Sequence, residues 1–436
     1  MGVLDDVSVV ELSIAIAAPS CCRMLAFHGA EVVKVESRGN PDVARLFGSA
    51  WAAGMDMGPY MDTSPYVAEM SANKRSVGLN LKFAEAREVA LALLADADVF
   101  VTNYSTPAVR ALGLAYEDVV AVNPGIVYVA LPGFGSDQSQ PYYEFLAWGP
   151  NQAPLTGLDE LTGHPDQVPS GIATIAPPDY FAGLHALAAV LTGLEHRDRT
   201  DEGSFVDIAQ FETTVSSLGP FLLDHQLSGH TAMRTGNRLE WMAPQGVYPC
   251  AGEEQWVGLS VADDRQWLAF AELLGDDALG EQYGSLDGRV ANHDALDALI
   301  ERWTSTRSAT EAATRLQEAG IAAHEVLSNR EVLRDQQIRS RHWYQFLGSK
   351  RFEDGDVFSG HAIHLGATPG RWWRAGPSMG EDTVDVLTGR AGMSADAVDA
   401  LIESGAAYVD AAPELKLRRP YLDDAEVLDA LGAVRA

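Results

Sequence analysis

Cysteines and long apolar runs are scarce in this sequence. It has 3 cysteines among 436 residues, too few for a disulfide framework, so we expect buried, reduced thiols. No apolar run reaches the roughly 18 residues that a membrane-spanning helix needs. The first residues also lack the basic stretch and apolar core of a secretory signal. The sequence therefore predicts a cytoplasmic protein without membrane association.

Positive charge is scarce as well. Lysine and arginine together number 31 against 61 acidic residues, which gives a formal charge of −30. Such a surface repels nucleic acid and anionic lipid, so neither is an expected partner. A phosphate-rich ligand would have to bind where the few cations gather, and three of the lysines, Lys34, Lys74 and Lys82, lie early in the chain.

Several nucleotide and hydrolase motifs are missing. No GxGxxG follows the first predicted strand, and no GxxxxGK[ST], GxSxG or HExxH occurs. His361 and His364 form the nearest histidine pair, and we expect structural or surface roles for them rather than metal binding. The sequence thus predicts no resident metal.

Apolar runs and amphipathic stretches alternate in the first third of the chain. Short buried strands separated by helices are typical of a parallel sheet, so this part is predicted as Rossmann-like α/β. The expected strands are residues 7–12, 31–36, 98–102 and 126–130, and the expected helices are residues 20–28 and 83–95.

The middle of the chain changes character. Residues 132–178 are rich in Gly, Pro, Ser and Gln, which predicts a long functional loop. We expect a large Rossmann-like domain over residues 1–225, a smaller α+β domain over 226–320, and a return to the large domain with a C-terminal tail over 321–436. The return is placed there because the strand-like His324 region needs a sheet to join.

Asp179 is the most informative single residue. Two prolines precede it and a long apolar helix follows. One interpretation is a helix N-cap, since aspartate satisfies free N–H groups there. The other is a carboxylate nucleophile, kept ionised by the positive end of the helix. The residues alone leave both open.

A basic group lies near predicted strands. Arg38 follows the second strand, Asn103 follows the 98–102 strand, and Arg110 lies on the next helix. Ligands bind at such edges in α/β sheets, where arginine and lysine grip phosphates. Scattered surface charge is the alternative.

The order of several segments resembles the CaiB/BaiF, or family III, CoA transferases, a superfamily that includes formyl-CoA transferases and α-methylacyl-CoA racemases. The resemblance runs from about residue 5 to residue 406. Its matching segments are Ala17-Ala18-Pro19, residues 29–36, Asn73-Lys74-Arg75-Ser76, residues 97–103, Tyr143-Glu144, Asp179-Tyr180-Phe181-Ala182-Gly183, residues 199–208 and residues 380–383.

The resemblance implies a two-domain α/β fold in which two chains interlock like chain rings. It implies that Asp179 is the nucleophile, forming first an aspartyl anhydride and then an aspartyl-CoA thioester. Coenzyme A and acyl-CoA are then substrates, and no cofactor is bound permanently. The residues implied in CoA binding are Ala17, Ala18, Arg38, Asn73, Lys74, Arg75, Asn103 and Arg110. Tyr143 and Glu144 belong to the implied active-site segment, where Glu144 would orient Asp179 or its acyl group.

Two other functions stay open. A racemase or acyl-CoA isomerase would need an acid/base histidine in the Tyr143-Glu144 segment, and none is present there. A non-catalytic subunit of a heteromer with a paralogous chain is the second alternative.

Ile16 replaces the glutamine of formyl-CoA transferases, which argues against oxalate as a substrate. Residues 242–246, Met-Ala-Pro-Gln-Gly, occupy the place of the family's glycine-rich lid, and a lid rich in glycine is not obvious there. No motif indicates the donor or acceptor acid.

Overall fold

A computed structural model describes residues 2–46, 61–171, 176–348 and 355–410. The chain divides into two compact units. The large unit comprises Met1–Leu158, Ile172–Leu223 and Gln336–Ala436, and the small unit comprises Asp159–Gly171 and Asp224–Asp335. The predicted tail lies mostly outside the described residues.

The large unit is built on one sheet of seven strands in the order β12-β3-β2-β1-β4-β5-β6. All neighbouring strands are parallel except β12, which pairs antiparallel with β3. The predicted parallel α/β sheet is therefore confirmed. The strands are β1 Ser8–Leu12, β2 Glu31–Glu36, β3 Arg75–Leu79, β4 Val99–Thr102, β5 Val127–Ala130, β6 Ser204–Asp207 and β12 Ala407–Tyr408.

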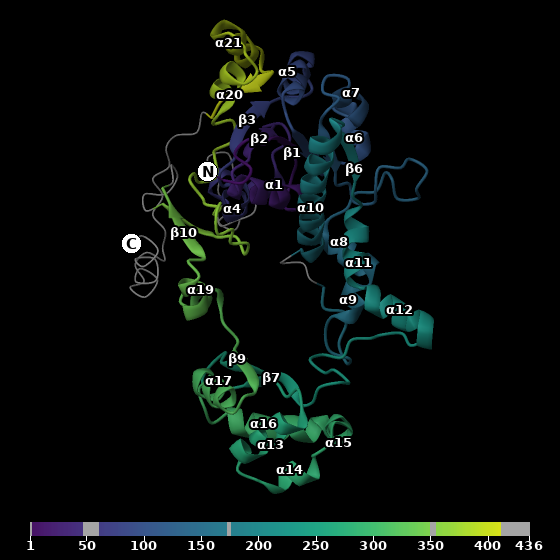
Figure 1. The fold of residues 1–436 in the computed structure, drawn as a ribbon, viewed down its shortest axis with the longest axis vertical. Helices are drawn as coiled ribbons and strands as arrows, with labels where there is room; N and C mark the ends of the chain where they lie inside the picture. The colour runs from purple at the N-terminus through teal and green to yellow at the C-terminus, as the bar shows by residue number, and fades with distance from the viewer. Residues whose placement is uncertain (1, 47–60, 172–175, 349–354, 411–436) are drawn as a thin grey trace. The chain divides into compact units, whose positions relative to one another are not determined.

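Alternate strand residues face two helical layers. Val9 packs in a cluster with helices α1 and α10, whereas Val10, its neighbour, packs with helices α5, α20 and α21 on the other face. Both faces are covered, which explains why the strands are apolar throughout. Figure 1 shows α10 beside α1. The helices that flank the sheet are α1 Ala17–Phe27, α5 Ala84–Ala95, α6 Thr106–Ala111, α7 Tyr116–Val120, α10 Pro177–Thr200, α20 Thr383–Gly389 and α21 Ala395–Ser404.

The remaining elements of the large unit are short. Part of the predicted 132–178 loop is in fact helical, as α8 and α9. The run that forms α8 begins Gly-Pro-Asn and contains a further proline, so no helical period is visible in the sequence. Two of the short elements, α9 and α12, cross the boundary between the units. The short elements are η1 Val43–Leu46, η2 Met61–Thr63, α4 Pro65–Ser71, α8 Gly149–Thr156, α9 Leu158–Leu161, α11 Gln210–Ser217, α12 Gly219–Ser228, α19 Gln336–Ser340, β10 Tyr344–Leu347 and β11 Asp356–Ser359.

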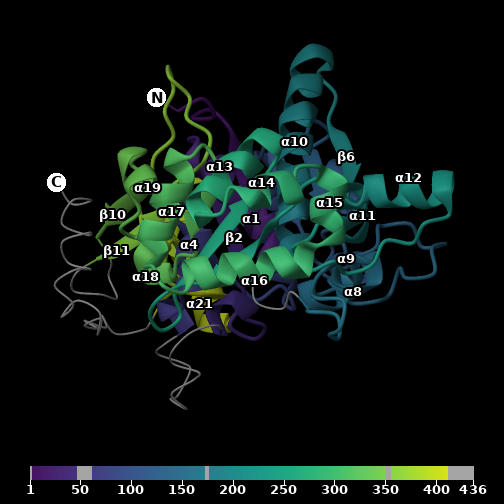
Figure 2. The same ribbon diagram turned by 90° about the horizontal axis from the view of Figure 1, so that it is seen from below.

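The small unit packs helices on an antiparallel sheet of three strands, β7-β8-β9. Trp267 and Phe270 lie at the centre of its core, and its helices carry labels in Figure 2, the view from below. The elements are β7 Gln245–Pro249, β8 Trp256–Ser260, α13 Asp264–Leu274, α14 Ala278–Gln282, α15 Leu286–Ala291, α16 His293–Thr304, α17 Ala309–Glu318, β9 Ala322–Glu325 and α18 Asn329–Val332.

The predicted return to the large unit at residue 321 is wrong in position. Strand β9 pairs with β8, with His324 opposite Gly258, so the strand finds its sheet inside the small unit. The chain returns only at Gln336. Among the described helices, none is both long and apolar enough to cross a membrane.

Candidate active site

Asp179 is the third residue of α10. Ala176 precedes the helix in the left-handed conformation with φ 48°, and Pro177 and Pro178 form the first turn. Proline suits these positions because their N–H groups have no helical partner. The N-cap interpretation of Asp179 is therefore wrong. The carboxylate is free for another task, although it still lies at the positive end of the helix.

The Asp179 carboxyl is enclosed but not sealed. Its residue is 8% exposed. Burial raises the pKa of this carboxyl to about 6, while hydrogen bonds from the backbone N–H groups of Ala17 and of Asp179 itself lower it. A group with a pKa near 6 is roughly nine-tenths ionised at pH 7. The site thus holds a poorly solvated carboxylate, which is a stronger nucleophile than a hydrated one.

A cavity of about 260 Å³ opens onto this carboxylate. Its walls come from the ends of β1 and β4, from α6, and from the segment before α8. Gly149 lies directly against the carboxyl, because a Cβ there would stand 2.9 Å from Asp179 Oδ2. The lining residues are Ile14, Ala15, Asn40, Asn103, Tyr104, Ser105, Ala108, Gly133, Phe145, Leu146, Ala147, Trp148, Asp179 and Gln210.

Ala17 and Ala18 begin α1 and are fully buried. The Ala17 N–H reaches the Asp179 carboxyl. Helices α1 and α10 approach closely here, because a Cβ at Gly183 would lie 2.0 Å from Ser20 Oγ and 2.8 Å from Ala17 O. The small residues of both helices therefore bring an N–H donor to the carboxylate.

Tyr143 and Glu144 do not line this cavity. Tyr143 is half-buried and Glu144 is exposed. The next residues line it instead, and Phe145, Leu146 and Trp148 are 58%, 68% and 44% exposed. Large apolar side chains left in solvent beside a buried carboxylate are a signal for a binding wall. The roles expected of Tyr143 and Glu144 stay predictions.

Asn103 and Arg110 lie on neighbouring cavities. Asn103 lines the Asp179 cavity, but both ends of its amide are bonded to Ile14: Oδ1 accepts the Ile14 N–H at 2.9 Å, and Nδ2 donates to the Ile14 carbonyl at 2.8 Å. Arg110 is exposed and lines a second cavity of about 270 Å³. Tyr104 lines both cavities, so the two adjoin.

Arg38 lies in the turn after β2 and is exposed. Its guanidinium carbon stands 5.0 Å from the centre of the Tyr408 ring, and Nη2 donates to the Val409 carbonyl at 3.0 Å. A guanidinium held by one face on an aromatic ring keeps its other donors for a phosphate.

Asn73 and Lys74 of the Asn73-Lys74-Arg75 segment face inward, whereas Arg75 is partly exposed. The buried Asn73 amide bonds the carbonyls of Ala26 and Arg371 and the N–H groups of Trp373 and Arg374. Its residue takes φ 64°, which asparagine tolerates better than most residues. The segment therefore ties distant stretches of the large unit together.

Lys74 and Arg75 are held by carboxylates. The Lys74 ammonium is fully buried, 2.7 Å from Glu11 Oε2, and it donates to the Pro19 carbonyl at 3.0 Å. Arg75 is the first residue of β3 and pairs with Glu31 at 3.2 Å. Direct phosphate contact, expected of Lys74, does not fit this burial.

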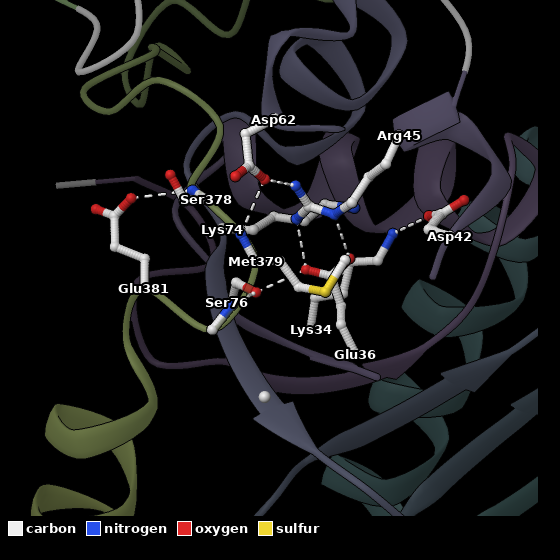
Figure 3. Close-up of polar contacts among 12 residues, drawn as sticks. Lys34, Glu36, Asp42, Arg45, Asp62, Lys74, Ser76, Ser378, Met379 and Glu381 are labelled. Atoms are coloured by element: carbon white, nitrogen blue, oxygen red, sulfur yellow. Dashed lines mark hydrogen bonds and ion pairs between the residues drawn. The ribbon is translucent and has the colours of Figure 1, made fainter. Parts of the chain in front are cut away.

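A buried ion-pair cluster lies behind the cavity, and the sequence reasoning did not identify it. The Lys34 ammonium points at Asp42, and the Arg45 guanidinium lies between Glu36 and Asp62 (Figure 3). Asp42 also accepts the N–H of Ala15, a cavity-lining residue, at 2.7 Å. The only sequence signal for Asp42 was its place just beyond a strand end.

Comparisons with known proteins agree with this geometry. The model of "CoA-transferase family III" matches residues 4–383. A succinyl-CoA–D-citramalate CoA-transferase of Chloroflexus aurantiacus is 29% identical over 90% of this chain and 95% of its own length. A succinate–glutarate CoA-transferase of Agrobacterium fabrum is 29% identical over 88% and 94%.

A solved structure is similar as well. A CaiB/BaiF family protein from Brucella suis superposes with a TM-score of 0.79 at 27% identity, over 89% of this chain and 99% of that one. The resemblance read from the sequence motifs is therefore confirmed. The chain belongs to the family III CoA-transferases and is a CoA-transferase.

Proposed function

We propose that this enzyme moves coenzyme A from an acyl-CoA donor to a carboxylic acid acceptor, with Asp179 as the covalent nucleophile. The observation that carries the proposal is a poorly solvated carboxylate at the head of α10 that opens onto a cavity. Such a group needs little desolvation before it attacks a thioester. Because each covalent intermediate is itself an activated carboxyl derivative, an anhydride or a thioester, the exchange needs no ATP.

The first half-reaction transfers the donor acyl group. An Asp179 carboxylate oxygen attacks the thioester carbonyl, the C–S bond breaks, and a mixed anhydride and CoA thiolate form. The thiolate then attacks the Asp179 carbonyl carbon, the anhydride C–O bond breaks, and the donor leaves as a free carboxylate. Asp179 now carries CoA as a thioester.

The second half-reaction repeats these steps in reverse order with the acceptor. The acceptor carboxylate attacks the aspartyl thioester and expels CoA thiolate, which gives a new anhydride. The thiolate then attacks the acceptor's acyl carbon, and Asp179 leaves as a carboxylate. Negative charge develops on an Asp179 oxygen whenever its carbonyl is attacked, and the Ala17 N–H is in place to stabilise it.

Arg38 and Arg110 are the proposed cations for the CoA phosphates. Both are exposed, and Arg110 lines the cavity that adjoins the Asp179 cavity. Ala17, Ala18 and Asn103 shape the ligand's approach through backbone and loop, whereas Asn73, Lys74 and Arg75 support the site from within. Guanidinium groups recognise phosphates through paired hydrogen bonds.

We further propose that two copies of the chain interlock as a homodimer in the cytoplasm. Exposed large apolar side chains on α10 and in the part of α12 that belongs to the large unit support a protein contact there: Leu184, Leu191, Phe221, Leu222 and Leu223. A paralogous partner in place of the second copy is the competing assembly. Mass measurement of the chain expressed alone separates the two.

The test starts from the purified chain with succinyl-CoA or acetyl-CoA as donor and a panel of carboxylic acids as acceptors. Transfer should occur, and hydroxylamine should trap an adduct on Asp179 when donor alone is present. Asp179→Asn should abolish both, while Glu144→Gln should keep the adduct. Full transfer by Asp179→Asn would refute the covalent mechanism.

Racemisation is measured in the same samples. Deuterium entering the α-carbon of an acyl-CoA without any acceptor acid would show proton transfer in place of CoA transfer. The cavity residues that the structure describes include no histidine, so we expect no such exchange. A chain that neither transfers CoA nor forms the adduct would instead fit a non-catalytic subunit.

A further inference from the structure

The loop between β1 and α1 determines where the Ala17 N–H stands. This loop spans residues 13–16, and Ile14 and Ala15 from it line the Asp179 cavity. Ala15 adopts φ 60°, the left-handed conformation that an alanine rarely takes without support. Something outside the loop must therefore hold it in this shape.

Two side chains from other elements hold the loop by its backbone. Asn103, after β4, pairs with both the N–H and the carbonyl of Ile14. Asp42, after β2, accepts the Ala15 N–H through Oδ1 at 2.7 Å, and the same oxygen accepts the Ala44 N–H at 2.9 Å. Consecutive residues of the loop are thus fixed from two directions.

Asp42 is itself fixed by the buried ion pairs. Its second oxygen takes the Lys34 ammonium, as Figure 3 shows. Lys34 Nζ also stands 3.9 Å from Glu11 Oε1, and Glu11 binds Lys74, which donates to the Pro19 carbonyl. Although burial raises the pKa of Glu11, the charges of Lys74 and Lys34 bring it below its usual range, so the cluster stays ionised. The cluster therefore anchors the backbone at Ala15 and at Pro19, on both sides of Ala17.

We propose that Asp42 and Asn103 are positioning residues that hold the Ala17 N–H against the Asp179 carboxyl through the 13–16 loop. This rests on the proposed covalent role of Asp179. The N–H then acts twice, by orienting the carboxylate for attack and by stabilising the oxygen when the aspartyl carbonyl is attacked in turn. Neither residue needs to touch the substrate for this role.

The matched test is a pair of double variants. Asp42→Asn with Lys34→Met removes the charge pair but keeps an oxygen for the Ala15 N–H. Asp42→Ala with Lys34→Met removes that oxygen as well. The two differ in the oxygen that accepts the N–H groups of Ala15 and Ala44, so a difference between them reports on these backbone contacts and not on the lost ion pair.

The alanine pair should lower kcat about 100-fold relative to the asparagine pair, the loss typical of one displaced oxyanion donor. The KM for acyl-CoA should change less than about threefold, because the cations proposed for the CoA phosphates, Arg38 and Arg110, lie outside the loop. The acid limb of kcat/KM, near pH 6 in the unmodified enzyme, should move to higher pH, because the Asp179 carboxyl loses an N–H that lowers its pKa.

Equal kcat in the two double variants, or an unmoved acid limb, would overturn the inference. If the alanine pair does not fold, Asn103→Ala decides, since it frees Ile14 without touching the ion pairs, and the same kinetic signature is expected of it. A change in KM alone for Asn103→Ala would identify it as a CoA-binding residue instead. If the unmodified enzyme forms no adduct at Asp179, the proposed covalent mechanism is wrong. That result is distinct from the kinetic outcomes of the variants.

Discussion

Replacing Asp179 with asparagine should make the protein more stable while it abolishes transfer. The carboxyl has an unperturbed pKa of 3.8 and, because burial outweighs the two N–H groups, a pKa of about 6 in the folded protein. A raised carboxyl pKa favours folding only while the group is protonated. This stabilisation is fully present below about pH 4 and is lost as the pH rises through 6.

The magnitude follows from the width of that window. At pH 7 the ionised carboxylate costs on the order of 3 kcal/mol relative to a neutral group, and at pH 5 it costs about half as much. Asp179→Asn should therefore raise the free energy of unfolding by up to about 3 kcal/mol at pH 7 and by well under 1 kcal/mol at pH 4. For a chain of 436 residues, the gain at pH 7 corresponds to a Tm rise on the order of 3 °C.

Urea unfolding of the two proteins at pH 4, 5, 6 and 7 measures the difference. Glu144→Gln is the matched control, since its carboxylate is exposed and its loss should change stability by less than about 0.5 kcal/mol. A gain that does not grow between pH 4 and pH 7, or no gain at pH 7, would refute the claim that Asp179 is a desolvated carboxylate.

Three further variants test other contacts. Lys74→Met should lower the free energy of unfolding by about 3–5 kcal/mol, because it removes the nearer of the two cations beside the buried Glu11 carboxylate and leaves only Lys34, at 3.9 Å. Adding Glu11→Gln should restore part of this loss in urea unfolding. Gly149→Ala should lower kcat at least about tenfold, because its Cβ would lie 2.9 Å from Oδ2 of Asp179, the proposed nucleophile. Gly219→Ala, with no atom within 4 Å of its added Cβ, should match the unmodified enzyme in rate. Arg110→Met should raise the KM for acyl-CoA about tenfold at low salt and less at high salt, and a salt-independent KM would speak against phosphate contact.

The strands were readable from the sequence because both faces of the sheet are buried. A strand covered on two sides is a continuous apolar run, and the predicted run at residues 31–36 coincides with β2. Helix α8 was missed because a Gly- and Pro-rich stretch carries no helical period. The return of the chain was misplaced because a strand-like pattern does not say which of two sheets the strand joins.

Within the site, the sequence predicted Asp179 as the nucleophile but did not predict the residues that support it. The position of Asp179 after two prolines and before a helix is a local feature. The burial of Lys74 is not local, because its carboxylate partner Glu11 lies 63 positions away. Asp42 contacts Ala15, 27 positions earlier. Such contacts depend on which strands become neighbours in the sheet, and a local sequence pattern does not predict that order.

Strand β12 has a consequence for how the molecule is made. It covers one end of the edge of β3 with Ala407 and Tyr408, the latter so close to Gly78 that a Cβ there would lie 2.5 Å from its ring. Asp382 and Thr383 bond the N–H groups of Ser76 and Gly78 on the same edge. Until residues 382–408 have left the ribosome, that edge has free N–H and carbonyl groups and can pair with another unfinished chain. Chains terminated before residue 382 should therefore aggregate, and recruitment of a chaperone to the exposed edge should end once β12 has been made.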